Sequence, residues 1–441
     1  MRPDFPAISI FENLRFNLFY ILPYFLQGIF TKNKFWVSIL TRIHPDYAAV
    51  KFIQHLRSKY RTRYLYLYML RNRSLLVLDT DGIKRVLDYS PAIYAAAELK
   101  ERGMSHFQPG AVTISEGDDW QERRRFNEAV LESSAHVHSY ADHFLNIISK
   151  EVISITNSGR RLYWSHFDRL FKTITLQVIF GTLAKSDAGL TDRLEVMMRE
   201  SNRIFLLGKS REFDGFYTAI RSFLAKPQPE SLSFKCRHAP STTNTKIENQ
   251  IPHWMFAMME TLAANMVRTL ALIVSHPAVE SRVRGELRDR TVLSPADVDS
   301  LRYLEGCVQE GMRLWPTTPF LVRQTIQEDL LADRKIPAKT QVLIMNNFNH
   351  RDWETVPFAD KFNPDFWLKT NADYRFNHLS NGTQVCAGKN LAFFIAKGVL
   401  ATFLRTGRYA LTRPPLHPDK PIPYAYNEFR VEFENTTGRC L

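Results

Sequence analysis

Cys386 is the residue whose setting in this sequence most clearly permits chemistry. It lies in the segment Asn-Gly-Thr-Gln-Val-Cys-Ala-Gly, residues 381–388, which leads into an apolar, helix-like stretch at 391–403. Backbone N–H groups at a helix N-terminus are expected to lower the pKa of such a cysteine and to donate hydrogen bonds to its sulfur. A buried thiolate of this kind is a good ligand for haem iron. The alternative is a buried structural cysteine at an ordinary loop–helix junction.

Glu310 and Arg313 form a second pair with chemical potential. Residues three apart share one face of a helix, so these two can form a charge-assisted hydrogen bond beneath a cofactor pocket. Pairs at this spacing also occur on solvated surfaces, where they contribute roughly 0.3–0.5 kcal/mol. We interpret this pair as structural, and we expect the loss of either residue to abolish cofactor incorporation.

Glu260 is a carboxyl group within an apolar stretch that continues to residue 275. Its neighbours on both sides are apolar, apart from Thr261 directly after it. A lone acid in such surroundings is costly unless it has a partner or a purpose. A surface-facing position on the helix is the alternative.

The order of these segments resembles the cytochrome P450 family. Between Glu310 and Cys386 lie Ile-Pro-Ala-Lys-Thr at residues 336–340 and Phe-Asn-Pro at 362–364, as in that family. The resemblance extends from about residue 40 to the C-terminus. Trp120 and Arg124 are similar to the family's Trp-x-x-x-Arg helix, and their i, i+4 spacing places both on one face. The chain most resembles divergent fungal members that act in secondary metabolism.

This resemblance implies haem b as the cofactor, with Cys386 as the axial thiolate ligand of the iron and Gly388 in the same cofactor-binding loop. It also implies that Trp120, Arg124 and Arg323 bind the haem propionates. An arginine offers fixed donors that match a carboxylate.

The resemblance further implies that Glu260 and Thr261 are the catalytic acid–hydroxyl pair. The acid would relay protons and the hydroxyl would bond at the oxygen site.

The sequence departs from the family pattern at several positions. Leu379 stands where a phenylalanine is expected, and Gln384 replaces the usual basic residue two before the ligand. Phe366 leaves no arginine to complete the usual triad with the structural pair. Met258 and Met259 replace a glycine turn, which predicts a narrower oxygen groove or substrate pocket.

The fold class predicted is mainly α with small β-sheets, in a single large domain of cytochrome P450 type. Helical periodicity dominates the middle of the chain, and the polar stretch 226–250 is predicted to be a loop too polar to pack. Helices are expected at 139–156, 167–180, 190–207, 213–224, 252–275, 278–288 and 300–314. Strands are expected at 64–78, 319–346 and 428–433. A doubly wound nucleotide-binding fold is disfavoured because no glycine-rich strand-to-helix turn occurs.

Composition limits the partners. The 441 residues, 45% of them hydrophobic, can bury a large core, and their net charge of +13 suggests an acidic partner or an anionic membrane surface. Basic and aromatic residues alternate at 61–73, but a β-hairpin explains this pattern better than nucleic-acid binding. The four cysteines lack CxxC spacing, which indicates neither a zinc site nor a disulfide framework.

Residues 1–35 are predicted to associate with a membrane, and residues 36–441 to form the haem-thiolate monooxygenase domain. The apolar stretch 18–26 contains a proline and is shorter than the about 20 residues that a spanning helix needs. We therefore expect it to lie in the membrane interface, with a flap packed on the domain as the alternative. The expected location is the cytosolic face of the endoplasmic reticulum membrane, or otherwise the cytoplasm.

The implied activity is insertion of one oxygen atom from O2 into an apolar small molecule, such as a terpenoid or polyketide intermediate. No flavin or nicotinamide domain is visible, so electrons would come from a separate NADPH-dependent reductase. Residues 104–109 and 203–207 are expected to face the substrate. The alternatives are a peroxide-dependent or rearranging haem-thiolate enzyme, and a degenerate, non-catalytic haem-binding protein.

Overall fold

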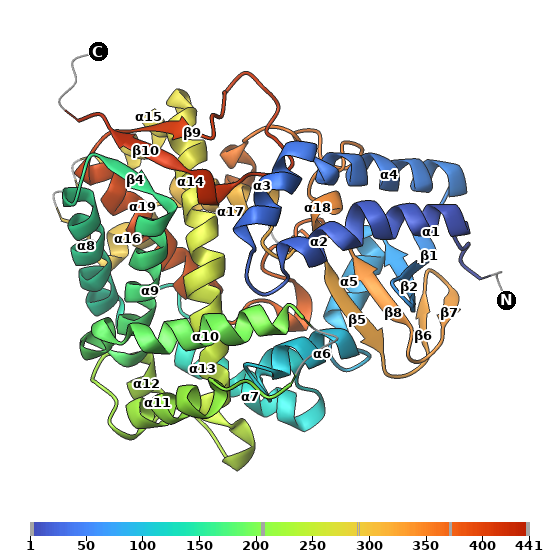
Figure 1. The fold of residues 1–441 in the computed structure, drawn as a ribbon, viewed down its shortest axis with the longest axis horizontal. Coiled ribbons are helices and arrows are strands. Elements are labelled where there is room, and N and C mark those ends of the chain that lie inside the picture. The colour runs from blue at the N-terminus through green and yellow to red at the C-terminus, as the bar shows by residue number, and fades with distance from the viewer. Residues whose placement is uncertain (1–3, 204–207, 289, 291, 370–372, 438–441) are drawn as a thin grey trace.

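A computed structural model describes residues 4–203, 208–288, 290, 292–369 and 373–437. Helices form most of the molecule, and the largest sheet lies at one side together with the N-terminal helices (Figure 1). The predicted fold class, mainly α with small sheets, is confirmed.

The largest sheet has the strand order β1-β2-β8-β5-β3. Its hairpin pairs β1 (Tyr64–Met69) with β2 (Asn72–Val77) in antiparallel register, as the alternating sequence predicted. Strand β8 (Gln341–Ile344) then pairs parallel to β2, and β5 (Leu321–Thr325) pairs antiparallel to β8. The edge strand β3 (Tyr94–Ala96) pairs with the half of β5 that carries Arg323.

Two smaller sheets complete the β structure. One has the order β4-β10-β9, and the other pairs β6 with β7. Their strands are β4 (Arg161–Tyr163), β6 (Asp329–Leu331), β7 (Arg334–Ile336), β9 (Tyr409–Arg413) and β10 (Glu432–Asn435). The strand expected at 428–433 begins later, because Asn427 caps a 3-10 turn at Glu428–Arg430.

The helices follow the predicted periodicity closely. In the N-terminal third they are α1 (Ile10–Phe16), α2 (Leu22–Gln27), α3 (Lys34–Ile43), α4 (Pro45–Tyr60), α5 (Thr80–Asp88), α6 (Glu98–Ser105) and α7 (Gly117–Leu131). In the middle they are α8 (Ala141–Asn157), α9 (Trp164–Phe180), α10 (Ala188–Ser201), α11 (Phe213–Ala225) and α12 (Leu232–Lys235). The remainder are α13 (Ile247–Phe256), α14 (Ala263–Ser275), α15 (Pro277–Glu286), α16 (Pro295–Ser300), α17 (Arg302–Leu314), α18 (Asn346–Asn349) and α19 (Lys389–Thr406).

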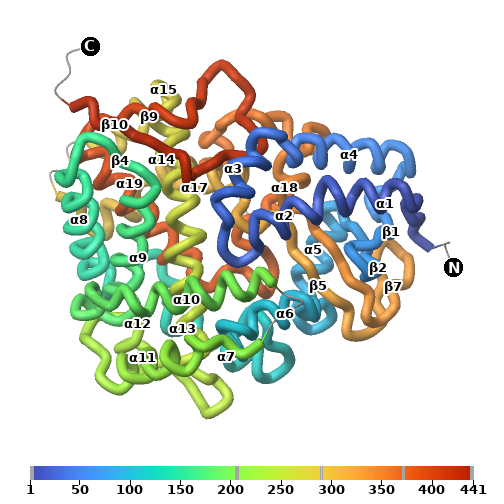
Figure 2. The backbone as a smooth tube through the Cα atoms, viewed as in Figure 1, coloured from blue at the N-terminus to red at the C-terminus, as the bar shows by residue number. Residues whose placement is uncertain are grey.

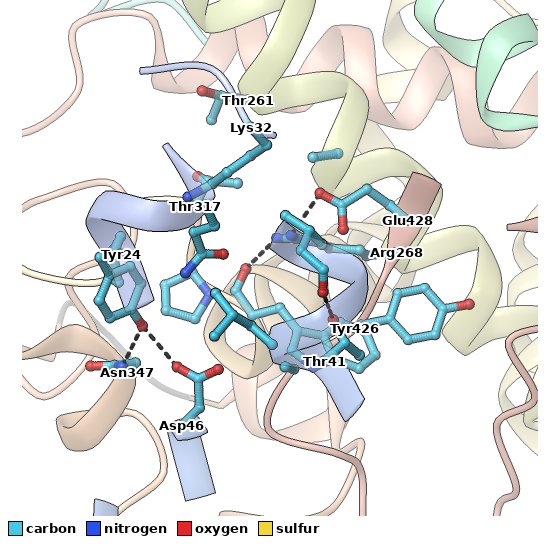
Figure 3. A pocket seen from close by; sticks show the side chains of 18 of the residues that line it. Tyr24, Lys32, Thr41, Asp46, Thr261, Arg268, Thr317, Asn347, Tyr426 and Glu428 are labelled. Atoms are coloured by element: carbon cyan, nitrogen blue, oxygen red, sulfur yellow. Dashed lines mark hydrogen bonds and ion pairs between the residues drawn. The ribbon is translucent and has the colours of Figure 1, made fainter. Parts of the chain in front are cut away.

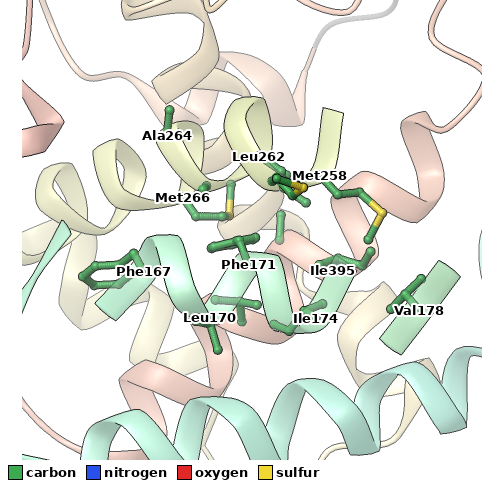
Figure 4. Packing of buried hydrophobic residues seen from close by; sticks show 14 of the residues in the cluster. Phe167, Leu170, Phe171, Ile174, Val178, Met258, Leu262, Ala264, Met266 and Ile395 are labelled. Carbon is green, nitrogen blue, oxygen red and sulfur yellow. The ribbon is translucent and has the colours of Figure 1, made fainter. Parts of the chain in front are cut away.

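A long helix runs through the middle of the molecule (Figure 1). It consists of α13, a π-helical turn at Ala257–Leu262, and α14. Side chains of α9 pack against Met258, Leu262 and Met266, and Ile395 of α19 joins the same cluster (Figure 4). The span Thr243–Ser275 is long and apolar enough to cross a membrane, but 78% of its apolar window is buried, as in a core helix.

The segment 226–250 corrects one expectation, because it packs although it is polar. Ser231 and Thr245 are fully buried, and their hydroxyl groups donate to Gln228 and Glu122 respectively. The Gln250 side chain donates to the carbonyls of Gly110 and Thr245. Polar residues can pack where their hydrogen bonds are satisfied in this way.

The N-terminal helices lie against the largest sheet. The chain enters beside β1, where the Ile8 backbone N–H donates to the carbonyl of Tyr66 at 2.9 Å. Phe16, Tyr20 and Ile21 are buried, and the Tyr20 hydroxyl donates to the side chain of Asn347. Residues 4–35 are therefore packed on the domain by one face.

Candidate functional site

The loop before α19 places Cys386 at the N-terminal end of that helix. Gly382 has φ +64°, and a Cβ atom at this position would collide with the carbonyl of Leu87, so only glycine fits. The Cys386 backbone N–H donates to the carbonyl of Leu379 at 2.9 Å, and Gly388 is the N-cap residue of α19. The loop that the sequence predicted is therefore a fixed turn.

The surroundings of the Cys386 thiol set its pKa. Its side chain keeps accessible surface, yet burial in the surrounding protein raises its pKa. The Gly388 N–H donates to the sulfur, and together with Arg124 and Lys389 it acts to lower the pKa, but burial dominates. The expected lowered pKa is therefore wrong for the free thiol. A metal ion at this position would deprotonate the thiol outright.

Glu310 and Arg313 form the buried ion pair that their spacing predicted. Both side chains are 0% exposed, and two Arg313 nitrogens donate to the two Glu310 oxygens at 2.7 Å each. Arg313 also donates to the carbonyls of His350 and Lys361. The pair thus ties α17 to the segment that leads toward the cysteine loop.

Trp367 supplies the contact that seemed lost with the missing arginine at Phe366. Its indole Nε1 donates to Glu310 Oε2 at 2.9 Å, and the backbone N–H of Asn363 donates to Oε1 at 2.9 Å. No arginine is present, as the sequence indicated, and a neutral donor one residue later takes its place on Glu310. A search for arginine at a fixed position could not find this residue.

Arg323 lies buried on β5 with no carboxylate partner among the described residues. Its guanidinium donates to the Ser90 hydroxyl and to the carbonyl of Val322, and desolvation lowers its pKa to about 10. Lys100 in the first turn of α6 is close enough to Arg323 for their charges to repel. Burial together with this repulsion lowers the Lys100 pKa to about 7. With no anionic partner in the described ranges, these two enclosed cations would suit the carboxylates of a cofactor.

Arg124 and Trp120 lie on α7 beside the cysteine loop. Arg124 donates to Glu128 and to the carbonyl of Val385, both at 2.6 Å. Its guanidinium therefore already has protein partners, although one of them is the residue before Cys386. Trp120 is half-buried.

These observations fit a haem group held between Cys386 and the central helix. The Cys386 side chain is exposed, and α19 packs against the π-helical turn Ala257–Leu262. Arg323 and Lys100 would neutralise two propionates. Lys100 was absent from the sequence prediction, because a lone lysine far from any motif carries no signal.

Glu260 lies on that π-helical turn. It lines a pocket, and burial raises its pKa to about 7. The Thr31 hydroxyl donates to Glu260 Oε1 at 3.0 Å and acts to lower the pKa. Glu260 therefore does not lie on the outer surface, and its carboxyl group can be protonated at neutral pH.

Thr261 lines the same pocket as Glu260 (Figure 3). The pocket has a volume of about 120 Å³, below the roughly 300–1,000 Å³ of typical ligand sites. Its apolar wall includes Phe30, Leu40, Phe256, Ala264 and Trp315. It therefore suits a small apolar group or one end of a larger molecule.

Charged groups line the other side of this pocket (Figure 3). Arg268 pairs with Glu428 at 3.0 Å, and the Tyr24 hydroxyl donates to Asp46 at 2.9 Å. Lys32 donates to a backbone carbonyl, and burial lowers its pKa to about 8. The pocket is thus lined by both apolar and charged side chains.

The first expected substrate-facing segment, 104–109, does not line the pocket that holds Glu260 and Thr261. Phe107 and Gln108 are fully buried, and both polar atoms of the Gln108 side chain lack a partner among the described residues. Residues 204–207 of the second segment, and the end of the helix expected at 190–207, lie outside the described residues.

The family model for cytochrome P450 matches residues 217–424. This range begins in α11 and contains Glu260, Thr261, Arg323 and Cys386.

Curated relatives match a shorter part of the chain. Cytochrome P450 4c3 of Drosophila melanogaster is 30% identical over 37% of this chain and 32% of its own length. Cytochrome P450 714C2 of Oryza sativa subsp. japonica is 31% identical over 39% of this chain and 37% of its own length. Human cytochrome P450 4V2 is 30% identical over 36% of this chain and 32% of its own length. The match thus spans about a third of these relatives. They are animal and plant proteins, and the fungal type remains a prediction.

A solved structure matches nearly the whole chain. The crystal structure of a 6-coordinated cytochrome P450 from Thermus thermophilus superposes with a TM-score of 0.65 and 16% identity. The superposition covers 88% of this chain and 97% of the other. The fold is therefore shared well beyond the range in which the sequences match.

Proposed function

We propose that this chain, which matches the cytochrome P450 family model over residues 217–424, is a haem-thiolate monooxygenase that inserts one oxygen atom from O2 into an apolar small molecule. The observation that carries this proposal is the position of Cys386. Its thiol is accessible at the N-terminal end of α19, which packs against the turn that bears Glu260 and Thr261. A thiolate that would hold the iron and an acid–hydroxyl pair that would deliver protons are the parts that this reaction needs.

Thiolate-ligated haem, when bound, supplies the activation of dioxygen. The Cys386 sulfur would hold the iron, and Arg323 and Lys100 would hold the propionates. Glu260, with its pKa raised to about 7, can both release and take up a proton at neutral pH. The Thr261 hydroxyl in the same pocket can hand that proton on.

The substrate is proposed to be an apolar secondary-metabolite intermediate such as a terpenoid or polyketide. Support comes from the aromatic and aliphatic wall of the pocket, which includes Phe256 and Trp315. The assignment of this class rests on the resemblance of the sequence to fungal enzymes.

Electrons are proposed to come from a separate NADPH-dependent reductase that docks on the basic surface of the protein, whose net charge is +13. The test is to combine the purified haem-loaded protein, a membrane-bound reductase, NADPH and 18O2 with a panel of terpenoids and polyketides. We expect one 18O atom in the product and no product without the reductase.

The same experiment separates the alternatives. If the variants Glu260→Ala and Thr261→Ala still turn over substrate with peroxide alone, the protein is a peroxide-dependent or rearranging enzyme. Weak haem binding without oxygen consumption would identify a non-catalytic protein.

Membrane association is proposed for the outer face of the N-terminal helices. Large apolar side chains recur there at helical spacing and are exposed, including Ile10 at 78% and Phe11 at 80%. Leu14, Leu18 and Leu22 continue the same face, opposite the buried Phe16 and Tyr20. An exposed apolar stripe of this length indicates an interaction site, and interfacial helices bind lipid in this way.

The division into a membrane-associating segment (1–35) and a monooxygenase domain (36–441) stays a prediction, as does the location at the cytosolic face of the endoplasmic reticulum. The test is flotation with vesicles of phosphatidylcholine and phosphatidylserine. We expect the parent protein to float and the double variant Phe11→Ser/Leu18→Ser to remain in solution. A cytoplasmic protein would not float in either form.

A further inference from the structure

A tight turn at residues 28–33 connects α2 to α3 (Figure 2). Ile29, Phe30 and Lys32 of this turn line the pocket that holds Glu260 and Thr261. Gly28 has φ +88°, and a Cβ atom there would collide with the carbonyl of Thr31, so glycine is required. The Lys32 ammonium closes the turn by donating to the carbonyl of Gly28 at 2.9 Å. We call residues 28–33 the N-terminal turn.

Asn202, directly after α10, fixes the N-terminal turn from the other side. Its Oδ1 accepts the backbone N–H groups of Ile29 at 2.8 Å and Phe30 at 2.9 Å. Its Nδ2 donates to the carbonyl of Thr31 at 2.8 Å. One side chain therefore sets the backbone position of three successive residues.

This arrangement aims the Thr31 hydroxyl at the central helix. It donates to Glu260 Oε1 at 3.0 Å. Among the described residues no other hydrogen bond to the Glu260 carboxyl group is present, and the carboxyl group also lines the pocket with Thr261.

We propose that Thr31 is a positioning residue for Glu260, and that the N-terminal turn thereby holds the proton-relaying carboxyl group in its working orientation. This inference rests on the proposed function, because it assigns the proton relay to Glu260. In each cycle Glu260 would release one proton toward the oxygen site and take one back from water in the pocket. The carboxyl group is then regenerated, and Thr31 keeps its hydrogen bond throughout.

Charged groups on the neighbouring helices explain why a neutral partner matters here. Asp168 on α9 and Glu195 on α10 face Glu260 and disfavour its charge. Lys172 lies between them, paired with Asp168 at 3.1 Å and Glu195 at 2.5 Å, so most of its charge is already compensated. Lys32 adds a weaker positive influence from the N-terminal turn. The Thr31 hydroxyl is thus the direct donor that stabilises the carboxylate.

The direct test is an infrared titration of the Glu260 carboxyl group in the purified full-length protein. The band is assigned by its loss in Glu260→Gln. We expect an apparent pKa of about 7 in the parent. In Thr31→Val, which removes the hydroxyl but keeps the shape, the value should rise by roughly 0.5 to 1, as expected for one lost hydrogen bond.

Three further variants make this result specific. Thr31→Ser keeps a hydroxyl group and should restore the parent value. Asn202→Ala releases the N-terminal turn and should raise the apparent pKa of Glu260, as Thr31→Val does. If Thr31→Val does not fold, Asn202→Ala provides the test. Thr156→Val is the control, because the Thr156 hydroxyl donates only to a carbonyl within α8 and lies outside the pocket. An unchanged Glu260 titration in both Thr31→Val and Asn202→Ala would overturn the proposal.

Turnover gives an independent arm. With reductase and NADPH, Thr31→Val should lose product several-fold relative to the NADPH consumed and release hydrogen peroxide instead, and Thr31→Ser should recover the coupling. Coupled turnover in Thr31→Val equal to that of the parent would contradict the role of Thr31. A parent protein without any turnover would contradict the proposed function, while the infrared titration would still decide whether Thr31 positions Glu260.

Discussion

Two glutamates, Glu310 and Glu260, lie in two regions that differ in the number and charge of their hydrogen-bond partners. Beneath the cofactor site, Glu310 receives two hydrogen bonds from Arg313 and one each from Trp367 and the Asn363 backbone. On the pocket side, Glu260 receives one hydrogen bond within the described part of the chain, from the neutral Thr31. We call the surroundings of Glu310 the fixed region, because its carboxylate is held by several donors. We call the surroundings of Glu260 the titrating region, because its carboxyl group can exchange a proton.

This difference shows how the same side chain can be structural in one place and catalytic in another. A carboxylate that is fully paired holds its neighbours together, because removing any partner leaves a buried charge. A carboxyl group with one neutral donor and an open side toward a pocket can exchange a proton. The pKa of Glu260, raised to about 7 by burial, agrees with the second case.

The largest effect is expected from breaking the fixed region. Arg313→Ala leaves Glu310 buried without its cation, which should lower the free energy of unfolding by about 3–5 kcal/mol and abolish haem incorporation. Urea denaturation and the visible spectrum measure the two losses. Lys335→Ala is the control, because Lys335 pairs with Glu328 on the surface and its loss should stay below about 1 kcal/mol. Equal losses in both variants would contradict the structural role.

Replacing the titrating carboxyl group should remove activity and spare the fold. Glu260→Gln keeps a hydrogen-bond acceptor for Thr31 but cannot relay protons, so product formation should fall by roughly 10² to 10⁴-fold. Turnover measured with saturating reductase checks the loss of activity. A free energy of unfolding within about 1 kcal/mol of the parent value checks that the fold is kept. Full turnover in this variant would remove Glu260 from the mechanism.

A smaller effect tests the substitute partner in the fixed region. Trp367→Phe removes the indole donor to Glu310, and a hydrogen bond to a charged group contributes about 1.5–3 kcal/mol. Denaturant unfolding measures this loss. Trp353→Phe is a matched control, since its indole also donates to a carboxylate, Asp360, but at an exposed position. If the control lost as much stability as Trp367→Phe, burial would not be what distinguishes Glu310.

The sequence predicted the fixed region better than the titrating one. The i, i+3 spacing of Glu310 and Arg313 is local, so it translates directly into contact on a helix. Trp367, Lys100 and Thr31 could not be predicted in the same way. Each acts on a partner far away in the chain, through a contact that only the packing of the fold creates.

The same reason explains the other outcomes. Most helices and the hairpin followed from periodicity, because the spacing of buried side chains within a helix or strand is visible in a short stretch of sequence. The packed segment 226–250 did not, because its polar groups are satisfied by distant partners such as Glu122. The raised pKa of the Cys386 thiol was missed because burial, which depends on the whole fold, outweighs the local helix terminus.

The smallest predicted effect concerns pH. The relay needs the acid form of Glu260, and with a pKa of about 7 this form is abundant below pH 7 and is lost above it. Above pH 7 the rate of product formation should therefore fall with rising pH, by a factor that approaches ten for each pH unit. Rates measured between pH 6 and 9 should show this decline in the parent and a flat profile in the residual activity of Glu260→Gln. A parallel decline in both would assign the titration to another group.

The most direct test of the whole account is the visible spectrum of the dithionite-reduced protein with carbon monoxide, recorded beside Cys386→Ser. A thiolate ligand predicts a strongly red-shifted Soret band in the parent that disappears in the variant. A folded parent protein without that band would contradict haem-thiolate ligation by Cys386 and favour the non-catalytic alternative.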